Sequence, residues 1–215
     1  AMDSFYFQKA VAVKSSVLRN VIDPTALRQR AEKAELRGHS NVVFLGRMSE
    51  PKNPLRLLKV LELLSRLVPQ LDARVIGSGE LEEAVRSAWE ASPAKEHIQL
   101  LGYQSNAYGL LKDTDLMLMT SLWEGTPMCA LEAMALGVPI VSTPVDGLKD
   151  LVEPGQTGFL EESDEALARR CAQIIGDPAL RQRLSERTYQ KAEKLLDLNV
   201  YRQQLRDAYG FGGSL

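Results

Sequence analysis

The chain has 215 residues, of which 45% are hydrophobic and 25% are charged, as in an ordinary globular protein of one large or two small domains. A net charge of −2 gives no support to a nucleic-acid-binding surface, so any anion site has to be local. Cys129 and Cys171 are the only cysteines, and without a CxxC pair we expect neither a disulfide framework nor a zinc site. The apolar runs are much shorter than the roughly 20 residues of a membrane span.

The first forty residues differ from the rest of the chain. They begin with Ala1-Met2-Asp3, which looks like a cloning remnant and not like a signal peptide. One apolar run, Ala10–Val13, is followed by a charged helix predicted over Thr25–Arg37. We interpret residues 1–40 as the end of an interdomain linker that leads into a domain at residues 41–210. We therefore expect the chain to be a piece of a longer protein.

From Asn41 onward, short apolar runs alternate with amphipathic segments. Asn53 is predicted to cap a helix whose first turn contains Pro54, and Asp177-Pro178 is predicted to open another helix in the same way. The predicted strands are Val42–Leu45, Arg74–Ile76, Ile98–Leu101, Leu116–Met119, Pro139–Ser142 and Gly158–Leu160. The predicted helices are Leu55–Val68, Glu80–Trp89, Asn106–Lys112, the later part of Glu124–Leu136, Asp164–Ile175, Leu180–Leu196 and Asn199–Tyr209.

This alternation predicts an α/β domain with a Rossmann-like parallel sheet that is flanked by helices on both faces. Ligands of such sheets bind beyond the carboxyl ends of the strands. Several glycine-bearing loops follow predicted strands and should meet at that edge: Gly46-Arg47, Gly77-Ser78-Gly79, Gly102 and Glu124-Gly125. The sequence therefore predicts a single site at one edge of the sheet.

Two carboxylates stand close together in the segment after the fourth predicted strand. Seven residues separate Glu124, in a predicted loop, from Glu132, in the helix predicted to start at Met128. A helix start binds anions through its exposed N–H groups and its dipole. Carboxylates beside an anion pocket repel the anion, so we expect them to hold hydroxyls, and an anion next to bound hydroxyls describes a sugar nucleotide. The alternative is that Glu124 is an ordinary loop residue and Glu132 a solvated helix residue.

Six elements in order resemble the carboxyl-terminal domain of GT-B-fold retaining glycosyltransferases, the large group 1 family that includes sucrose synthase and bacterial mannosyl- and glucosyltransferases. The resemblance covers roughly residues 20–209. The elements are Asn20-Val21-Ile22-Asp23 for NG(V/I)D, Gly46–Lys52 for GRLxxxKG with Asn53 in place of its last glycine, Gly77-Ser78-Gly79-Glu80 for GxGP, Leu101-Gly102-Tyr103 for FLG, Glu124–Glu132 for E-x7-E, and the run EAMALGVPIV.

The resemblance implies a role for each matching residue. Arg47 and Lys52 would neutralise the donor diphosphate, whose leaving group needs charge stabilisation. Glu132 would accept hydrogen bonds from the ribose hydroxyls. Glu124 would be the catalytic carboxylate, holding the donor sugar and stabilising positive charge on the anomeric carbon. The backbone would serve the sugar at Gly125 and Thr126 and the diphosphate at Met128 and Cys129, and the base would border Leu101, Gly102 and Tyr103.

The chain departs from the family pattern in two places. Pro127 stands where the family often has glycine, and because proline has no N–H one backbone donor to the sugar is missing. Asp146–Asp150 replaces a GG-x-x-E loop, with an acid in place of the first glycine, which leaves the role of this loop open.

The remaining polar candidates are expected to be structural. Asp113-Thr114-Asp115 imitates a metal-binding DxD, but at the end of a helix aspartates more often cap or solvate, so we expect no metal and no cofactor. His39 and His97 should be surface residues at the opposite edge, and Cys129 a packed side chain and not a nucleophile. Trp123 is either an acceptor platform or a packing residue.

The resemblance also implies partners. The donor would be a UDP-, GDP- or ADP-linked hexose-type sugar, and the acceptor a glycan or a lipid-linked molecule. The family's active site lies between two Rossmann domains, and an amino-terminal acceptor-binding domain is missing here, so the isolated chain should be inactive. Peripheral membrane contact would come through that missing domain. We expect a cytoplasmic protein, with the inner face of the membrane as the alternative location. The alternative function is a non-catalytic sugar-nucleotide-binding module.

Overall fold

The computed structural model describes residues 20–209. The start at Ala1-Met2-Asp3, the apolar run Ala10–Val13 and the glycine-rich end after Tyr209 lie outside the described residues. Our expectations for those segments stay predictions, as does the division of the chain after residue 40.

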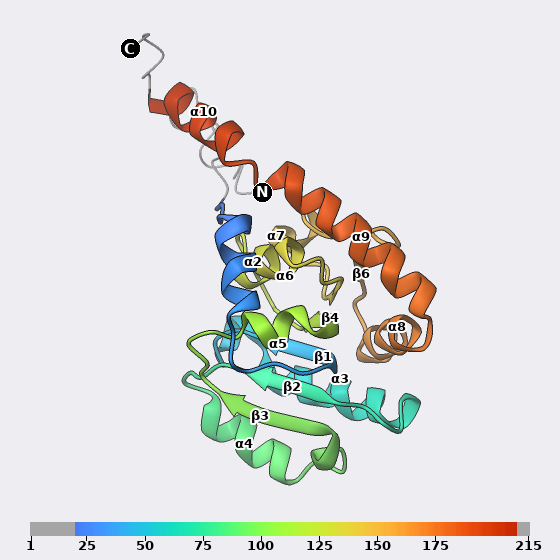
Figure 1. Ribbon diagram of the computed structural model, residues 1–215. Coiled ribbons are helices and arrows are strands. Elements are labelled where there is room, and N and C mark those ends of the chain that lie inside the picture. Colours follow the sequence, from blue (N-terminus) through green and yellow to red (C-terminus); the bar gives the residue numbers. More distant parts are fainter. Residues whose placement is uncertain (1–19, 210–215) are drawn as a thin grey trace, which may run out of the picture.

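Six parallel strands form one sheet at the centre of the molecule (Figure 1). They are β1 (Ser40–Leu45), β2 (Ala73–Ile76), β3 (Ile98–Gly102), β4 (Thr114–Met119), β5 (Ile140–Ser142) and β6 (Gly158–Leu160). Their order is β3-β2-β1-β4-β5-β6, and each neighbouring pair is parallel. This confirms the predicted Rossmann-like sheet. The order reverses between β1 and β4, which is where such sheets leave a crevice for a ligand.

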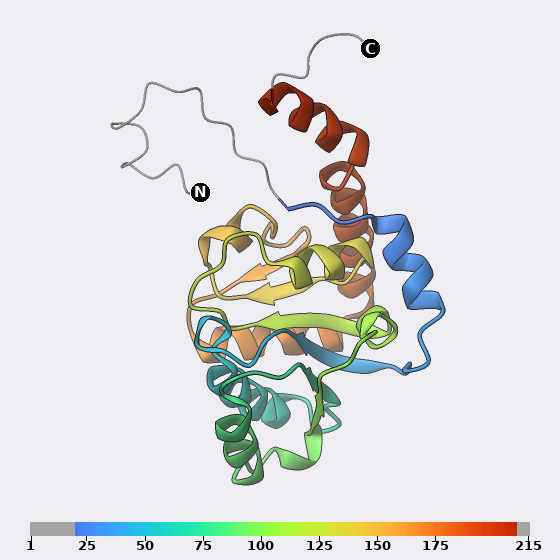
Figure 2. The same ribbon diagram turned by 90° about the vertical axis from the view of Figure 1, so that its left-hand side faces the viewer.

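Helices cover both faces of the sheet (Figures 1 and 2). They are α2 (Pro24–Glu32), α3 (Pro54–Leu67), α4 (Glu82–Glu90), α5 (Tyr108–Lys112), α6 (Met128–Ala135), α7 (Asp146–Lys149), α8 (Asp164–Gly176), α9 (Pro178–Leu195) and α10 (Leu198–Tyr209), with 3-10 turns η1 (Glu50–Lys52) and η2 (Lys95–His97). Strand residues alternate between the faces: Val42 and Leu116 pack into one apolar cluster with α3, α4 and α8, whereas Val43 and Met117 pack into another with α5 and α6.

Asn53 stands at the N-cap of α3 and Pro54 lies in its first turn, as predicted. However, the side chain of Asn53 makes no capping hydrogen bond, and its backbone is left-handed at φ 47° and ψ 57°. Among residues 20–209 it is the only residue other than glycine with a positive φ. The chain turns from η1 into α3 here, and a left-handed residue is tolerated as glycine or, next best, asparagine. The same requirement explains why the similar family motif has glycine at this position.

Two other helix ends can be compared with the sequence. Asp177 caps α9 as predicted, because its carboxylate accepts a hydrogen bond from the N–H of Leu180 at 2.9 Å. The first helix, α2, ends at Glu32 and not at Arg37 as predicted. The helix closes with a tight turn in which the N–H of Ala34 donates to the carbonyl of Ala31 at 3.2 Å, and the Arg37 guanidinium donates to the same carbonyl at 2.9 Å. This carbonyl is therefore satisfied without further helical turns.

Close packing of two glycine-bearing loops fixes the carboxyl edge of the sheet near β1 and β2. Gly77 has a φ of 141°, and a Cβ at this position would lie 1.8 Å from the carbonyl oxygen of Gly46. The N–H of Met48 donates to the carbonyl of Ser78 at 2.9 Å. Only glycine at position 77 allows this approach, so the loop that leads to Lys52 is held against the turn after β2.

Candidate functional site

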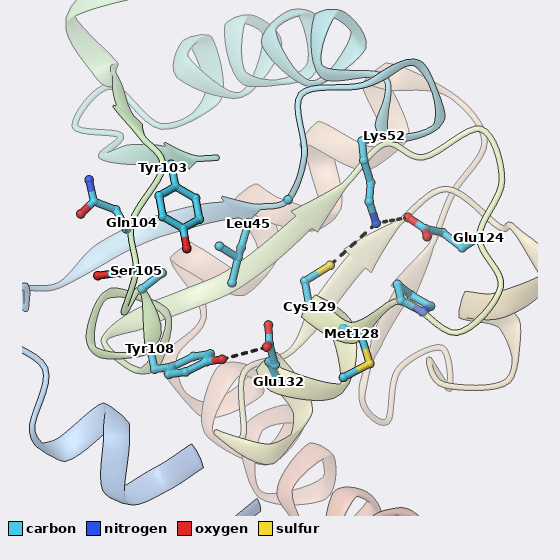
Figure 3. A pocket seen from close by; sticks show the side chains of 13 residues that line it. Leu45, Lys52, Tyr103, Gln104, Ser105, Tyr108, Glu124, Met128, Cys129 and Glu132 are labelled. Atoms are coloured by element: carbon cyan, nitrogen blue, oxygen red, sulfur yellow. Dashed lines mark hydrogen bonds and ion pairs between the residues drawn. The ribbon is translucent and has the colours of Figure 1, made fainter. Parts of the chain in front are cut away.

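A pocket of ≈ 520 Å³ lies at the carboxyl edge of the sheet, where the strand order reverses. Its walls come from the loop after β1, the segment between β3 and α5, and the loop and helix after β4 (Figure 3). This confirms that the glycine-bearing loops meet at one edge. The side chains that carry chemistry in its lining are Lys52, Tyr103, Tyr108, Glu124, Met128, Cys129 and Glu132.

The backbone around Lys52 is anchored to the end of β4. The hydroxyl of Thr120 contacts the carbonyl oxygens of Lys52 at 3.3 Å and Asn53 at 3.0 Å. The N–H of Leu122 donates to the carbonyl of Pro51 at 2.8 Å. Because Thr120 is buried, these contacts set the position from which the Lys52 side chain reaches into the pocket.

Lys52 and Glu124 form an ion pair at one side of the pocket (Figure 3). The Nζ of Lys52 lies 2.5 Å from Oε1 of Glu124, and the side chains are only 17% and 10% exposed. The hydroxyl of Ser121 donates to the same oxygen at 2.7 Å. The Ser121 carbonyl in turn accepts from the hydroxyl of Thr143 at 2.6 Å. Glu124 is therefore held by groups on three segments and is not a freely moving loop residue.

The loop of uncertain role, Asp146–Asp150, supports the Glu124 loop from behind. Most of it forms α7, and the N–H of Gly147 donates to the carbonyl of Glu124 at 3.3 Å. A Cβ at Gly147 would lie 1.7 Å from the carbonyl oxygen of Gly125. The two loops therefore pack backbone to backbone. Asp146 is exposed and pairs with Lys149 at 3.2 Å, so the acid that replaces the family's first glycine points away from this packing.

The start of α6 borders the middle of the pocket between the two carboxylates. The N–H groups of Ala130 and Leu131 donate to the carbonyl of Pro127. In the part of the chain that the structure describes, no acceptor pairs with the N–H groups of Met128 or Cys129. Two donors at a helix start are thus left for an anion.

Cys129 packs beneath this helix start and is not arranged as a nucleophile. Burial raises the pKa of its thiol to about 11, although nearby Lys52 acts in the opposite direction. The Nζ of Lys52 lies 3.9 Å from its Sγ. A thiol with such a pKa keeps its proton at neutral pH and is a poor nucleophile.

Glu132 lies on the opposite side of the pocket from Glu124 (Figure 3). It is the fifth residue of α6, so it stands just over one turn into the helix. Its Oε1 accepts a hydrogen bond from the hydroxyl of Tyr108 at 3.0 Å. Both glutamates therefore border one pocket, as predicted from their spacing, and they face it from opposite sides.

Other predicted site residues lie at the margin of the pocket or outside its lining. Tyr103 lines the pocket and is 72% exposed, but Leu101 and Gly102 do not line it. Arg47 is 72% exposed and pairs with Glu80 at 3.1 Å instead of pointing into the pocket. The roles assigned to these residues stay predictions.

Two residues that were predicted to bind the donor sugar, in the loop between the two glutamates, also lie outside the pocket lining. Gly125 is exposed and Thr126 is half-buried, and neither lines the pocket. The carbonyl of Thr126 accepts a hydrogen bond from the side-chain amide of Asn20 at 3.2 Å. The first residue of the NG(V/I)D-like segment therefore touches the loop that carries Glu124, and Trp123 in the same loop is 55% exposed.

Sequence reasoning missed the residues that hold the site in place. Ser121 and Thr143 support Glu124, Thr120 supports the Lys52 loop, and Tyr108 contacts Glu132. Two consecutive hydroxyl residues, Thr120-Ser121, end an otherwise apolar strand run, and this signal could have identified them. Tyr108 gives no such signal, because its partner is 24 positions away.

The DxD-like aspartates belong to the opposite, amino edge. Asp115 is buried, and its carboxylate accepts from His39 and Asn41, both at 2.9 Å, and pairs with Arg181 at 3.2 Å. Asp113 accepts from the N–H of Gly38 at 3.3 Å. Within residues 20–209, no group of three or more His, Cys, Asp or Glu side chains is placed to hold a metal. In the same range, no helix has the length and apolar character that crossing a membrane requires.

Comparisons with known proteins agree with this geometry. The poly(glycerol-phosphate) alpha-glucosyltransferase of Bacillus subtilis is 27% identical over 176 residues, which are 80% of this chain and 25% of that protein. The chain therefore spans about a quarter of this relative's length. Anabaena HepE, solved in complex with UDP-glucose, superimposes with a TM-score of 0.73 at 24% identity over 87% of this chain and 52% of that one.

A second solved structure matches in length as well as in fold. It is the carboxyl-terminal domain of the glycosyl transferase group 1 protein LpcC from Francisella tularensis, with a TM-score of 0.66 at 21% identity. The match covers 82% of this chain and 99% of that one. The family model of the group 1 glycosyl transferases matches residues 27–191, which include both glutamates and Lys52. The chain belongs to the group 1 glycosyl transferases.

Proposed function

We propose that this chain is the donor-binding domain of a retaining transferase that moves a hexose-type sugar from a nucleotide sugar to a glycan or a lipid-linked acceptor. One observation carries the proposal. Lys52, the start of α6, Glu124 and Glu132 all border a single pocket at the switch point of a Rossmann-like sheet. That combination supplies a cation and helix N–H groups for a diphosphate, and carboxylates for hydroxyls on either side of it.

The order of these groups supports an order for the donor. The helix start lies between the two glutamates in the pocket (Figure 3), as the diphosphate lies between ribose and sugar in a nucleotide sugar. Glu132, on the side of Tyr103 and Tyr108, would take the ribose. Glu124, in the loop beside Lys52, would take the donor sugar and stabilise the positive charge that develops on its anomeric carbon.

The comparisons favour a UDP-linked donor as the first one to test. HepE was solved with UDP-glucose, and the relative from Bacillus subtilis is named as an alpha-glucosyltransferase. We infer that the active site is completed by a second domain, since 82% of the chain covers 99% of a solved carboxyl-terminal domain. A cytoplasmic location, contact with a membrane through that second domain and independence from metal ions remain parts of this proposal.

Calorimetry on the isolated chain tests donor binding. UDP, GDP and ADP are titrated in the presence of EDTA, and at least one should bind, because Lys52 and the start of α6 supply the neutralising charge. No heat from any of the three would refute the proposal. Binding that needs Mg²⁺ or Mn²⁺ would refute the metal independence in this proposal, although Asp113 and Asp115 lie at the opposite edge of the sheet and do not line this pocket.

Transfer itself is tested in the full-length protein with the donor whose nucleotide binds. Release of the nucleoside diphosphate in the presence of an acceptor extract, and none from a Glu124→Gln variant, is expected. Tight binding of the donor without any transfer or donor hydrolysis would favour the alternative function, a non-catalytic sugar-nucleotide-binding module.

A further inference from the structure

Tyr108 joins three elements at the side of the pocket where Glu132 lies. It is the first residue of α5, it lines the pocket, and its hydroxyl lies 3.0 Å from Oε1 of Glu132 in α6. The guanidinium of Arg30 in α2 stacks over its ring, 4.7 Å from the centroid. The tyrosine is therefore held from behind by α2 while its hydroxyl points at the carboxylate (Figure 3).

The contact restricts Glu132 without neutralising it. A glutamate on a helix surface has several rotatable bonds, and ordering such a side chain costs conformational entropy. A neutral phenol donor fixes one carboxylate oxygen and leaves the negative charge in place. Among residues 20–209, Tyr108 is the only group that donates to this carboxylate. The second oxygen, Oε2, is thus left to accept hydrogen bonds from a ligand.

The protonation state of Tyr108 suits this role. Burial raises the pKa of its hydroxyl above its usual value, and the charge of Glu132 raises it further, while Arg30 acts weakly in the other direction. The hydroxyl therefore keeps its proton at neutral pH and remains a donor. The two glutamates thus differ in their partners: Oε1 of Glu132 accepts from a neutral phenol, whereas Oε1 of Glu124 is paired with the cation Lys52.

We propose that Tyr108 is a positioning residue, which holds the Glu132 carboxylate in the orientation that reads the two neighbouring hydroxyls of the nucleotide ribose. The inference rests on the proposed function, since it requires a nucleotide in this pocket. It adds that selection of ribose over dideoxyribose depends on the Tyr108 hydroxyl, although that hydroxyl does not itself touch the ligand.

A pair of ligands separates this role from a general effect on the pocket. Binding of UDP and of 2′,3′-dideoxy-UDP to the isolated chain is measured by calorimetry, with GDP or ADP pairs in their place if one of those nucleotides binds instead. Tyr108→Phe should weaken UDP about tenfold, the scale of a lost hydrogen bond to a charged group. The dideoxy analogue, which binds more weakly to the unchanged chain, should lose less than about twofold.

A matched control is available at a second tyrosine, Tyr189 in α9, which contacts the same helix α2. Arg28, also in α2, stacks over the ring of Tyr189 at 4.2 Å, and Tyr189 does not line the pocket. Tyr189→Phe removes a hydroxyl from a tyrosine with the same kind of stacked arginine and should leave both affinities unchanged. An equal loss of UDP affinity in Tyr108→Phe and Tyr189→Phe would contradict the proposal, because it would mean that both variants act through the packing of α2.

A double-mutant cycle tests the dependence on Glu132. In a Glu132→Ala background, Tyr108→Phe should cause no further loss of UDP affinity. Independent, additive losses would overturn the proposal, as would an equal loss of UDP and the dideoxy analogue on Tyr108→Phe, because either result means that Tyr108 acts on the ligand or on folding directly.

A ligand-free measurement distinguishes this inference from the proposed function. Tyrosine ionisation is followed by ultraviolet absorbance, and the contribution of Tyr108 is the difference between the chain and Tyr108→Phe. Replacing Glu132 by glutamine should lower the pKa of Tyr108, because an adjacent negative charge raises it. If the pKa of Tyr108 falls in Glu132→Gln as expected but no nucleotide binds, the proposed function is refuted, and with it the ribose role. If a nucleotide binds but the pKa of Tyr108 is unchanged in Glu132→Gln, only the positioning role is refuted.

Discussion

Both edges of the sheet carry clusters of charged side chains, but only one cluster is open to a ligand. At the amino edge, Oδ1 of Asp115 is shared by His39 and Arg181, and Oδ2 accepts from Asn41. A pocket of ≈ 350 Å³ lies beside them. Two charged groups that line it, Asp115 and Arg181, pair with each other. The Asp115 carboxylate therefore has little capacity left for a ligand.

The carboxyl edge has the opposite character. Glu124 and Glu132 each accept through Oε1, and no donor among residues 20–209 pairs with either Oε2. Both carboxylates border the larger pocket, next to a helix start with two N–H groups left for an acceptor. The comparison teaches that a count of acidic residues does not mark a site in this fold. What marks it is hydrogen-bonding capacity that the protein itself leaves unused beside a pocket.

The largest effect on binding is expected at the carboxyl edge. Glu132→Ala should weaken UDP about 100-fold, which is the loss of one or two hydrogen bonds from ribose hydroxyls to a carboxylate. The melting temperature should change little, because Glu132 is half-buried and has one protein partner. Calorimetry and a thermal melt on the same preparation check both statements.

Glu124→Ala is the control for that experiment. It should leave UDP binding nearly intact and weaken a UDP-sugar, since Glu124 would meet the sugar and not the ribose. In the full-length enzyme it should lower turnover more than donor affinity, because a carboxylate facing a developing cation matters most in the transition state. Loss of bare UDP binding in Glu124→Ala, with Glu132→Ala unaffected, would reverse the two assignments.

A smaller loss of affinity is expected at Lys52. Lys52→Ala should cost about 1.5–3 kcal/mol of UDP binding, the scale of a charge-assisted hydrogen bond, and should hardly affect uridine. Arg47→Ala is a matched loss of one cation from the same connection between β1 and α3. Its effect should be smaller, since Arg47 is largely exposed and pairs with Glu80 outside the pocket lining. Equal losses for uridine and UDP in Lys52→Ala would mean that the residue acts on folding or on the base.

At the amino edge, a substitution should change stability and not binding. Asp115→Ala removes the acceptor shared by His39, Asn41 and Arg181 and should cost about 1–3 kcal/mol of unfolding free energy. For a chain of this size, that lowers the melting temperature by about 2–4 °C per kcal/mol. UDP affinity below the transition should be unchanged. A loss of UDP affinity in this folded variant would break the contrast between the edges.

The sequence predicted the sheet and the convergence of the two glutamates for physical reasons. Short apolar runs between amphipathic helices have few folded arrangements other than a covered parallel sheet. Glu124 and Glu132 lie in one local segment, so a loop and a helix start suffice to place them. Asn53 stands at the predicted N-cap, but its side chain makes no capping hydrogen bond. Asparagine serves there a second preference, for the left-handed backbone that the turn before α3 requires.

The rest of the site depends on tertiary packing that a single sequence does not reveal. Lys52 pairs with Glu124 across 72 positions, and Tyr108 reaches Glu132 because α5 and α6 lie next to each other on one face of the sheet. Gly147 supports Gly125 by backbone contact alone. Such contacts leave no pattern along the chain, whereas the motifs to which we assign donor roles can be read directly from the sequence.

The smallest effect is expected at Cys129, in the middle of the open edge. Cys129→Ala keeps the backbone N–H at the start of α6, so UDP affinity at neutral pH should change by less than about twofold.

The effect of the Cys129 thiol should instead appear in the unfolding free energy at high pH. Burial raises its pKa to about 11 from 9.0, so the folded state holds the proton more tightly than the unfolded state. The stabilisation from the raised pKa is complete below pH 9 and is lost as pH rises toward 11.

The unfolding free energy of the unchanged chain, relative to that of Cys129→Ala, should therefore decrease by about 1 kcal/mol by pH 10. Urea unfolding of both proteins at pH 7, 9 and 10 measures this difference, in which the ionisation of all other groups cancels. A difference that stays constant over that range would show that the thiol ionises equally well in the folded and unfolded chain. Cys129 would then be accessible beside Lys52 and not a packed residue.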